Sequence, residues 1–264
     1  MAALLSAGGV KALAEPLDFR LEVVKVPVCG LPEALEGFRI VSLSDFHLLP
    51  FTQLDFLKKA VDFASALKPD LVVLLGDFVD ATVESIHDLA PVLETLRSRF
   101  GVMAVLGNHD YIQGSGIVAR TLLRHGVEVL MNSGILLPVG NASLYIAGTE
   151  SISSRFHLPW ALEGNHFGAP TLLLAHEPDV ADCVAADGRV ALQLSGHSHG
   201  GQVRFGGLER LLLPKGGRKY PYGSYQVGNL FLHTSRGLGT TGLPVRLGSP
   251  PEVTQVVLTR AAEA

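Results

Sequence analysis

Five short motifs in this chain of 264 residues carry side chains that commonly bind divalent metal ions. Aspartate, asparagine and histidine supply the hard or borderline oxygen and nitrogen donors that suit Mn²⁺, Fe, Zn²⁺ or Mg²⁺. The chain has only two cysteines, so we expect neither a cysteine-based zinc cluster nor a disulfide framework. In chain order, the motifs are Asp45-Phe46-His47, Gly76-Asp77-Phe78-Val79-Asp80, Gly107-Asn108-His109-Asp110, Ala175-His176-Glu177 and Gly196-His197-Ser198-His199-Gly200.

The number of donors in these motifs predicts a site for two ions. Seven donors exceed what one ion with an open position needs, and they suit two ions that share a bridging carboxylate. Two ions roughly 3.5–4 Å apart generate a hydroxide at neutral pH and stabilise the oxygens of an in-line displacement at phosphorus. Any one motif also fits an ordinary turn, because Asn and Gly are common turn residues. The prediction therefore rests on the ordered set.

Short apolar strands must position these motifs, because each motif directly follows an apolar run. Runs without polar alternation are typical of strands that are buried on both faces. Side chains at the carboxyl ends of such strands gather at one edge of an open α/β sheet. The five runs are 39–44, 71–75, 102–106, 171–175 and 191–194, and two further strands are expected at 229–234 and 253–259.

Amphipathic stretches between the strands predict helices. They lie at 53–67, 84–99 and 116–125. Alternating strands and helices indicate an α/β layered fold. After residue 200, closely spaced glycines predict a loop or hairpin excursion and not a new domain. We expect a single domain over 20–264, preceded by an N-terminal tail over 1–19.

The composition excludes several classes of protein. Hydrophobic residues make up 47% of the chain, charged residues 17%, and the mean hydropathy is +0.32, which excludes intrinsic disorder. A net charge of −4 argues against a broad basic surface, so a nucleic-acid polymer is not expected as a partner. Apolar runs fall short of the roughly 20 residues of a spanning helix.

The N-terminal residues leave the localisation open. Residues 2–14 are small and apolar and end in an Ala-x-Ala-like pattern, as in an export signal, but a basic n-region is missing. They are interpreted either as the remnant of an export signal or as a disordered or packed tail. The chain is accordingly expected in the cytoplasm, at a membrane surface, or outside the cell.

The motifs together resemble those of the calcineurin-like metallophosphoesterase superfamily. Asp-x-His, Gly-Asp-x-x-Asp, Gly-Asn-His-Asp, a lone histidine after a strand and Gly-His-x-His are all intact and in the family's order, with a motif core over 38–201. The downstream segments HSHGGQV (197–203), SRGLG (235–239) and PVR (244–246) resemble the bacterial branch that includes the YkuE and YaeI phosphodiesterases. The resemblance implies a four-layer α-β-β-α fold, in which two mixed sheets form a sandwich flanked by helices.

The resemblance also implies roles for the residues of the motifs. Asp77 would bridge two divalent ions, with Mn, Fe or Zn favoured and Mg²⁺ also suitable. His109 would donate a proton to the leaving oxygen and would not bind metal. A carboxylate must orient this histidine; the resemblance favours Asp80, and Asp110 is the alternative. The remaining ligands would be Asp45, His47 and His199 for the first ion, and Asn108, His176 and His197 for the second.

One departure from the family pattern narrows the expected substrate. The protein-phosphatase branch continues the second motif with Arg-Gly, whereas Ala81-Thr82 follow here. We therefore expect cleavage of a phosphodiester or pyrophosphate bond by a metal-bridging hydroxide. Any phosphate contact would come from elsewhere, with Arg236 as the main candidate and Lys215 and Arg218 as weaker ones.

Apolar segments beside the motifs suggest what else the substrate contains. Residues 48–51 and 211–214 are apolar, and a basic run follows the second segment. Exposed apolar residues beside basic ones are typical of proteins that contact an anionic bilayer. We expect a small or lipid-linked substrate, such as UDP-2,3-diacylglucosamine, and peripheral membrane association; packing of both segments into the core is the alternative. A nucleotide-directed phosphodiesterase is the second candidate, and a non-catalytic scaffold is disfavoured because all seven ligands are present. The oligomeric state is not predicted.

Overall fold

Two six-stranded mixed sheets form the centre of the molecule. The structure is a computed structural model that describes residues 12–13, 15–204, 206 and 213–261. The first sheet has the strand order β1-β12-β2-β3-β4-β5, with β2 to β5 parallel and β12 antiparallel to β2. Its strands are β1 (Arg20–Val28), β2 (Arg39–Leu43), β3 (Leu71–Leu74), β4 (Val102–Ala104), β5 (Val127–Val129) and β12 (Glu252–Arg260).

The second sheet has the order β10-β11-β9-β8-β7-β6. Its central strands β7, β8, β9 and β11 are parallel, and the edge strands β6 and β10 are antiparallel to their neighbours. The strands are β6 (Ser133–Val139), β7 (Ala142–Gly148), β8 (Thr171–Leu174), β9 (Leu192–Ser195), β10 (Gly223–Val227) and β11 (Leu230–Thr234).

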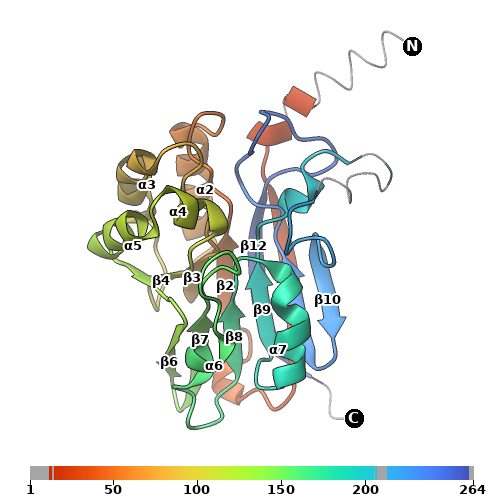
Figure 1. Cartoon of the computed structure of the whole chain (residues 1–264). Helices are drawn as coiled ribbons and strands as arrows, with labels where there is room; N and C mark the ends of the chain where they lie inside the picture. Colours follow the sequence, from red (N-terminus) through yellow and green to blue (C-terminus); the bar gives the residue numbers. More distant parts are fainter. Residues whose placement is uncertain (1–11, 14, 205, 207–212, 262–264) are drawn as a thin grey trace.

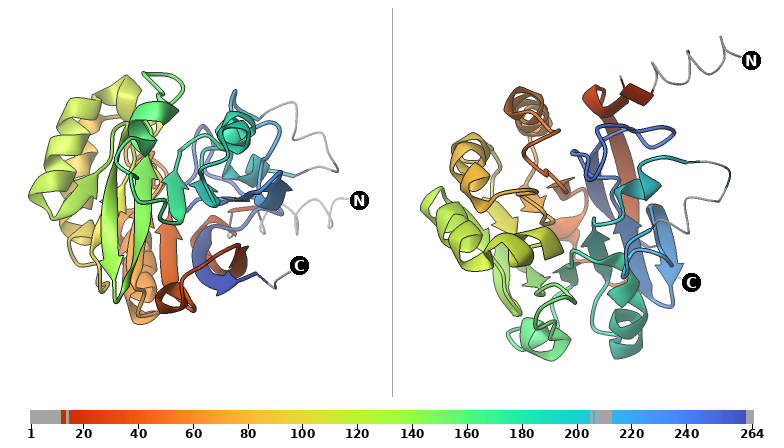
Figure 2. Two further views of the ribbon diagram at one scale, coloured as in Figure 1. Left: turned by 90° about the horizontal axis from the view of Figure 1, so that it is seen from below. Right: turned by 45° about the horizontal axis from the view of Figure 1, so that its top comes forward.

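Helices cover the outer faces of the two sheets (Figures 1 and 2). The first sheet carries α2 (Leu54–Ala66), α3 (Ile86–Leu93) and α5 (Ser115–Arg124), and the second carries α6 (Leu158–Leu162) and α7 (Ala181–Asp187). This arrangement confirms the predicted four-layer α-β-β-α fold. None of the helices among the described residues is long and apolar enough to cross a membrane.

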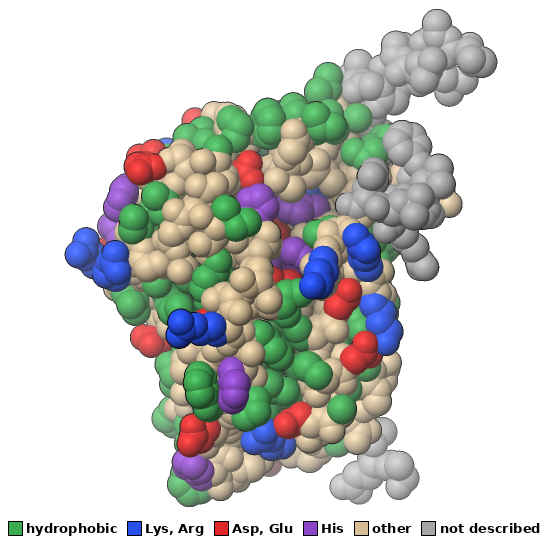
Figure 3. All heavy atoms as spheres, in the orientation of Figure 1, with side chains coloured by type: hydrophobic (Ala, Val, Ile, Leu, Met, Phe, Trp, Pro, Cys, Tyr) green, Lys and Arg blue, Asp and Glu red, His purple; other side chains and the backbone are tan. Residues whose placement is uncertain are grey.

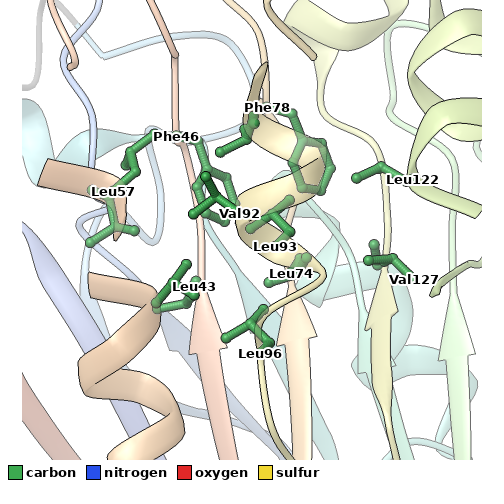
Figure 4. Packing of buried hydrophobic residues seen from close by; sticks show 14 of the residues in the cluster. Leu43, Phe46, Leu57, Leu74, Phe78, Val92, Leu93, Leu96, Leu122 and Val127 are labelled. Atoms are coloured by element: carbon green, nitrogen blue, oxygen red, sulfur yellow. The ribbon is translucent and has the colours of Figure 1, made fainter. Parts of the chain in front are cut away.

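Three apolar clusters join these layers. One lies between the sheets and includes Ile40 and Ile146, and another lies under α6 and α7. The third packs α2, α3 and α5 against the first sheet (Figure 4). Here Phe46 and Phe78 are fully buried and stack with ring centroids 5.2 Å apart. These two rings anchor the first two metal-type motifs in the core, because each follows a predicted ligand directly in the chain.

The predicted strands are confirmed, with ends that differ by one or two residues. The helix predicted over 84–99 is too long: α3 ends at Leu93, and the chain then turns back, with Arg97 donating its backbone N–H to Ser65 Oγ (3.1 Å). Three of the described α-helices were not predicted. They are α4 (Asn108–Gln113), which begins inside the third motif, and the short helices α6 and α7 on the second sheet.

Candidate metal and catalytic site

The five motifs meet at the carboxyl ends of β2, β3, β4, β8 and β9, where the two sheets lie beside each other. Figure 3 shows histidine side chains close together near the top of the molecule. The donor side chains form three groups, and within each group the donor atoms lie within 4.8 Å of one another. The groups are Asp45 with His47 and His199, Asp77 with His176 and His197, and His47 with Asp80 and His109. Asn108 joins the second group, because its Oδ1 lies 3.2 Å from His176 Nε2.

Four histidines each direct one ring nitrogen away from the cluster and one into it. The outward nitrogens are Nδ1 of His176, His47 and His199 and Nε2 of His197. They bond to Leu75 O (2.6 Å), Asp80 Oδ1 (3.1 Å), Gly239 O (3.3 Å) and Lys215 O (3.0 Å), respectively. The partners of His176, His47 and His197 are acceptors, so their outward nitrogens carry the proton, and the inward nitrogen of a neutral ring presents a lone pair. His199 Nδ1 lies 3.3 Å from both Gly239 O and Nη2 of Arg246, and its bond to Gly239 O gives it the same orientation. This orientation is typical of imidazoles that bind metal.

The inward nitrogens face one another in two pairs. His47 Nε2 lies 3.0 Å from His199 Nε2, and His176 Nε2 lies 3.2 Å from His197 Nδ1. Two lone pairs at such distances repel each other unless a proton or a cation lies between them. Oxygen donors from Asp45, Asp77 and Asn108 complete a set that suits a borderline divalent cation. The residues present therefore fit metal ions.

Asp77 lies between the two groups. Its Oδ2 is 3.4 Å from His47 Nε2 and 3.2 Å from His176 Nε2. Burial would raise the pKa of Asp77, but the positive charge of His176 and the hydrogen bonds from both histidines hold it well below its usual range. Burial would likewise lower the pKa of His47, yet bonds to Asp77 and Asp80 raise it to about 9. The buried carboxylates thus favour positive charge in the site.

The backbone at the predicted ligands adopts a conformation that side chains normally avoid. Non-glycine residues rarely have φ above zero, and such positions cluster at functional sites, where the surrounding structure compensates the strain. Five of the seven predicted ligands have φ between 41° and 74°, namely Asp45, His47, Asp77, His197 and His199.

Glycines allow the motifs to approach one another. A Cβ at Gly107 would collide with the carboxylate of Asp77, and one at Gly196 would collide with Ser44 and Asp45. Asp45 also accepts hydrogen bonds from the backbone N–H of His197, at 2.9 Å and 3.1 Å for its two oxygens. Side chains at either glycine would therefore push the ligand loops apart.

The two candidate orienting carboxylates have different environments. Asp80 Oδ1 lies 3.1 Å from His109 Nδ1, and this ring remains partly exposed. Asp110 is fully buried and accepts backbone N–H groups of Asp77, Phe78, Val79 and Gly107. Asp110 therefore fixes the loops that carry the ligands, whereas Asp80 contacts the ring of His109.

The comparisons with known proteins agree with this geometry. The family model for calcineurin-like phosphoesterases matches residues 38–201, which is more than half of the chain. The chain belongs to the calcineurin-like phosphoesterase family. It is accordingly a hydrolase that acts on phosphoric esters, with histidine and aspartate groups that can bind metal.

Curated relatives of this phosphoesterase include bacterial and vertebrate proteins. It is 33% identical to YkuE of Bacillus subtilis, an uncharacterized metallophosphoesterase, over 86% of this chain and 81% of that protein. It is 32% identical to the phosphodiesterase YaeI of Escherichia coli, over 90% and 88%. A zebrafish transmembrane protein with a metallophosphoesterase domain is 31% identical, and there the match covers 98% of this chain but 61% of the relative.

Solved structures share the fold at low identity. The 5′-nucleotidase precursor of Thermus thermophilus gives a TM-score of 0.50 at 18% identity, over 85% of this chain and 54% of that one. The TT1561 protein of the same organism gives 0.52 at 13% identity, over 76% and 90%. These likenesses concern the fold alone.

The predicted phosphate-binding bases of the phosphoesterase lie in different surroundings. Arg236 pairs with two glutamates, Glu252 at 3.1 Å and Glu22 at 3.4 Å, so its guanidinium is occupied by carboxylates. Arg218 donates Nε to Leu213 O, and its backbone N–H to Asp179. Lys215 is exposed, and its carbonyl bonds to His197 Nε2. Contact of any of these bases with substrate stays a prediction.

The predicted apolar segments are partly buried. Leu48 and Leu213 are buried, whereas Leu49 and Phe51 are each 37% exposed; residues 211 and 212 lie outside the described part of the chain. Leu243 is 63% exposed on a loop that joins the 48–52 segment through the bond from Thr240 N to Thr52 Oγ1 (3.2 Å). Figure 3 shows apolar side chains along the upper edge of the molecule.

Several residues of the site were not predicted from the sequence. Thr241 Oγ1 donates to Asp80 Oδ1 (3.1 Å), Ser44 bonds to the carboxylate of Asp45, and Arg246 lies 3.3 Å from His199 Nδ1. Arg246 belongs to the PVR segment, which resembles the family in sequence, but the sequence did not predict a role for this arginine. No pattern of spacing marks Thr241.

Proposed function

We propose that this protein is a binuclear metallophosphoesterase that cleaves a phosphodiester or pyrophosphate bond. The observation that carries the proposal is the pair of facing imidazole sets on either side of Asp77, whose Oδ2 is within 3.4 Å of a nitrogen from each set. A carboxylate in that position suits a bridge between two ions. Two ions held there would activate a water molecule as hydroxide and neutralise charge on the phosphate.

The ligands divide into two sets that share Asp77. Oxygen and imidazole donors together favour Mn, Fe or Zn, and Mg²⁺ is also compatible with the oxygen donors. The outward hydrogen bonds of the histidines fix the orientation of their rings, which raises the affinity for the ions. Asp45, His47 and His199 make up the first set, and Asn108, His176 and His197 the second.

His109 is the proposed proton donor to the leaving oxygen. Its ring is partly exposed, whereas the rings of the four histidine ligands are buried, so it can reach a substrate. Its backbone N–H bonds to Asp77 Oδ1 (2.9 Å), which fixes its position relative to the ligand sets. Asp80 orients the ring through Nδ1 and leaves Nε2 for the substrate.

The substrate is proposed to be a diester or anhydride. Ala81 replaces the arginine that grips a phosphomonoester in the protein-phosphatase branch, and Arg236 is held by two glutamates. The relative YaeI is named a phosphodiesterase. Nucleic-acid polymers are not proposed as substrates, because the net charge is −4.

A lipid-linked phosphodiester or pyrophosphate is the proposed form of the substrate, with UDP-2,3-diacylglucosamine as an example of a pyrophosphate. The exposed Leu49, Phe51 and Leu243 lie beside the site and could contact acyl chains or a membrane surface. A vertebrate relative is named as a transmembrane protein, which supports the proposal that this enzyme acts on a substrate at a membrane surface. A nucleotide phosphodiesterase is the alternative, because a diester lacking acyl chains fits the same metal site.

The test compares metal-free and reloaded protein. After chelation, the protein should hydrolyse a bis-aryl phosphodiester only when Mn²⁺ is restored. The His109→Ala variant should bind metal normally and lose most turnover, and full activity of this variant would refute its role. Product analysis with a lipid-linked pyrophosphate and with a cyclic nucleotide distinguishes the two substrate classes. Equal rates on lipid-linked and soluble diesters, without binding to liposomes, would refute the lipid proposal.

A further inference from the structure

Arg246 is the largest fully buried side chain among the described residues. It forms no ion pair with a described carboxylate, and its guanidinium instead donates to backbone carbonyls. These are Ser249 O (2.8 Å), Arg236 O (2.9 Å), Gly237 O (3.3 Å) and Gly239 O. Burial lowers its pKa, but a guanidinium keeps its charge at neutral pH in a protein. A charge buried in this way is costly, and its bonds to one loop indicate where it acts.

The carbonyls belong mainly to the 236–239 loop, which lies directly against Asp45. Leu238 N donates to Ser44 O (2.8 Å), and Gly239 N donates to Asp45 O (2.6 Å). Gly237 has φ +70°, and a Cβ there would lie 2.6 Å from Asp45 Cβ. The loop therefore determines the position of Asp45, and Arg246 holds the loop.

Arg246 also holds His199 from two sides. Gly239 O accepts hydrogen bonds from both Arg246 and His199 Nδ1, so the guanidinium fixes the acceptor that orients the imidazole. Ser249 O accepts from Arg246 Nη1, and Ser249 Oγ donates to the carbonyl of His199 (2.7 Å). Loss of Arg246 would release the ring and the backbone of this ligand together.

The other ligand set is held by different groups. Asp110 fixes the loops of Asp77 and Asn108 through backbone N–H groups, and Leu75 O orients His176. Arg246 makes no hydrogen bond to any of these described residues. Apart from the bonds from His197 N–H to Asp45, the two halves of the site thus have different supports. One is a buried carboxylate that binds N–H groups, and the other is a buried guanidinium that binds carbonyls.

We propose that Arg246 is a positioning residue for the ion bound by Asp45, His47 and His199, and not for the ion bound by Asn108, His176 and His197. The inference rests on the proposed binuclear site. The direction in which metal affinity changes when Arg246 is removed distinguishes positioning from a charge effect. A positive charge beside His199 repels a cation, so its removal alone would tighten binding, whereas loss of positioning weakens binding.

The test measures Mn²⁺ binding to the full chain by equilibrium dialysis and by electron paramagnetic resonance. Arg246→Met removes charge and hydrogen bonds, and Arg246→Lys keeps the charge but loses the planar fork. Gly237→Ala keeps the guanidinium and displaces the loop from Asp45. Arg99→Met is the matched control, because this exposed arginine precedes β4, whereas the site lies at the carboxyl end of that strand. Thermal unfolding of each metal-free variant checks folding.

Arg246→Met should lower the affinity for one of the two ions by about 10- to 100-fold, and the affinity for the other by less than threefold. The spectrum of a coupled Mn²⁺ pair should give way to that of a single ion. Arg246→Lys and Gly237→Ala should weaken the same ion, and they decide the question if Arg246→Met does not fold. Unchanged, tightened or equally weakened binding of both ions in the folded variants would overturn the inference. A wild-type protein that binds fewer than two ions would instead refute the proposed binuclear site.

Discussion

Replacing Asp80 with asparagine tests the proposed proton donor sharply, because a single oxygen of this carboxylate contacts three groups. Its Oδ1 lies 3.1 Å from each of His109 Nδ1, His47 Nδ1 and Thr241 Oγ1. The positive charges of these histidines and their hydrogen bonds outweigh burial and hold the pKa of Asp80 far below its usual range, so the carboxylate is charged. Asparagine keeps the shape of the side chain but removes the charge.

The expected loss follows from these contacts. A hydrogen bond to a charged group contributes about 1.5–3 kcal/mol, and 1.4 kcal/mol corresponds to a factor of ten. Asparagine keeps an acceptor oxygen, so the bond to His109 loses its charge and not its partner, which predicts a fall in kcat of about 10-fold. Weaker orientation of the predicted ligand His47 adds to it, for a total of about 10²-fold, at the lower end of the range of general acid catalysis.

The assay is hydrolysis of aryl phosphodiesters under saturating Mn²⁺, with leaving phenols of increasing pKa. Poor leaving groups need the proton donor most, so Asp80→Asn should slow them more than good ones. Thr241→Val is the matched control, because it removes one of the three bonds and leaves the charge; its loss should stay below about tenfold. Equal losses for all phenols, or a rate within threefold of the wild type, would refute the role of Asp80.

Three further predictions concern stability. Burial would raise the pKa of Glu252, but His233 and Arg236 lower it. The contribution of Glu252 to the free energy of unfolding is therefore present above the pKa it has in the unfolded chain. This contribution disappears as the pH falls through the pKa it has in the folded protein. Glu252→Gln should cost roughly 3–5 kcal/mol at pH 7 in urea unfolding of chelated protein, and a cost that does not shrink near pH 3 would contradict this. Phe78→Ala should cost about 3–5 kcal/mol and weaken metal binding, since the ring anchors Asp77; unchanged metal affinity would contradict the anchoring. Removing ions from a protein saturated at 100 times Kd should cost about 2.7 kcal/mol per ion and lower Tm by about 5–10 °C per ion, and an unchanged Tm would count against metal binding.

The meeting of the predicted ligand motifs at one edge of the sheets could be predicted from the sequence, because local chemistry and strand pattern coincide there. Asp45, Asp77 and His176 each follow an apolar strand, and the rule that parallel strands gather their carboxyl ends at one edge brings them together. The same rule supports the order of β2, β3 and β4. Sequence reasoning therefore succeeded where position along the chain determines position in space.

The supporting residues could not be predicted, because their partners are backbone groups distant in the chain. Arg246 acts through carbonyls of a loop up to ten residues away and on a histidine 47 residues away. Thr241 reaches Asp80 across 161 residues. Likewise, the end of α3 depends on a bond between Arg97 and Ser65, which lies on another helix. Hydrophobic period and motif spacing carry no information about such contacts.

The most direct test of the binuclear site is a titration of metal-free protein with Mn²⁺ in which bound metal and phosphodiester hydrolysis are measured on the same samples. The account predicts two ions bound per chain, with most of the activity appearing as the second equivalent binds. Full activity after one equivalent, or in the presence of excess chelator, would contradict it.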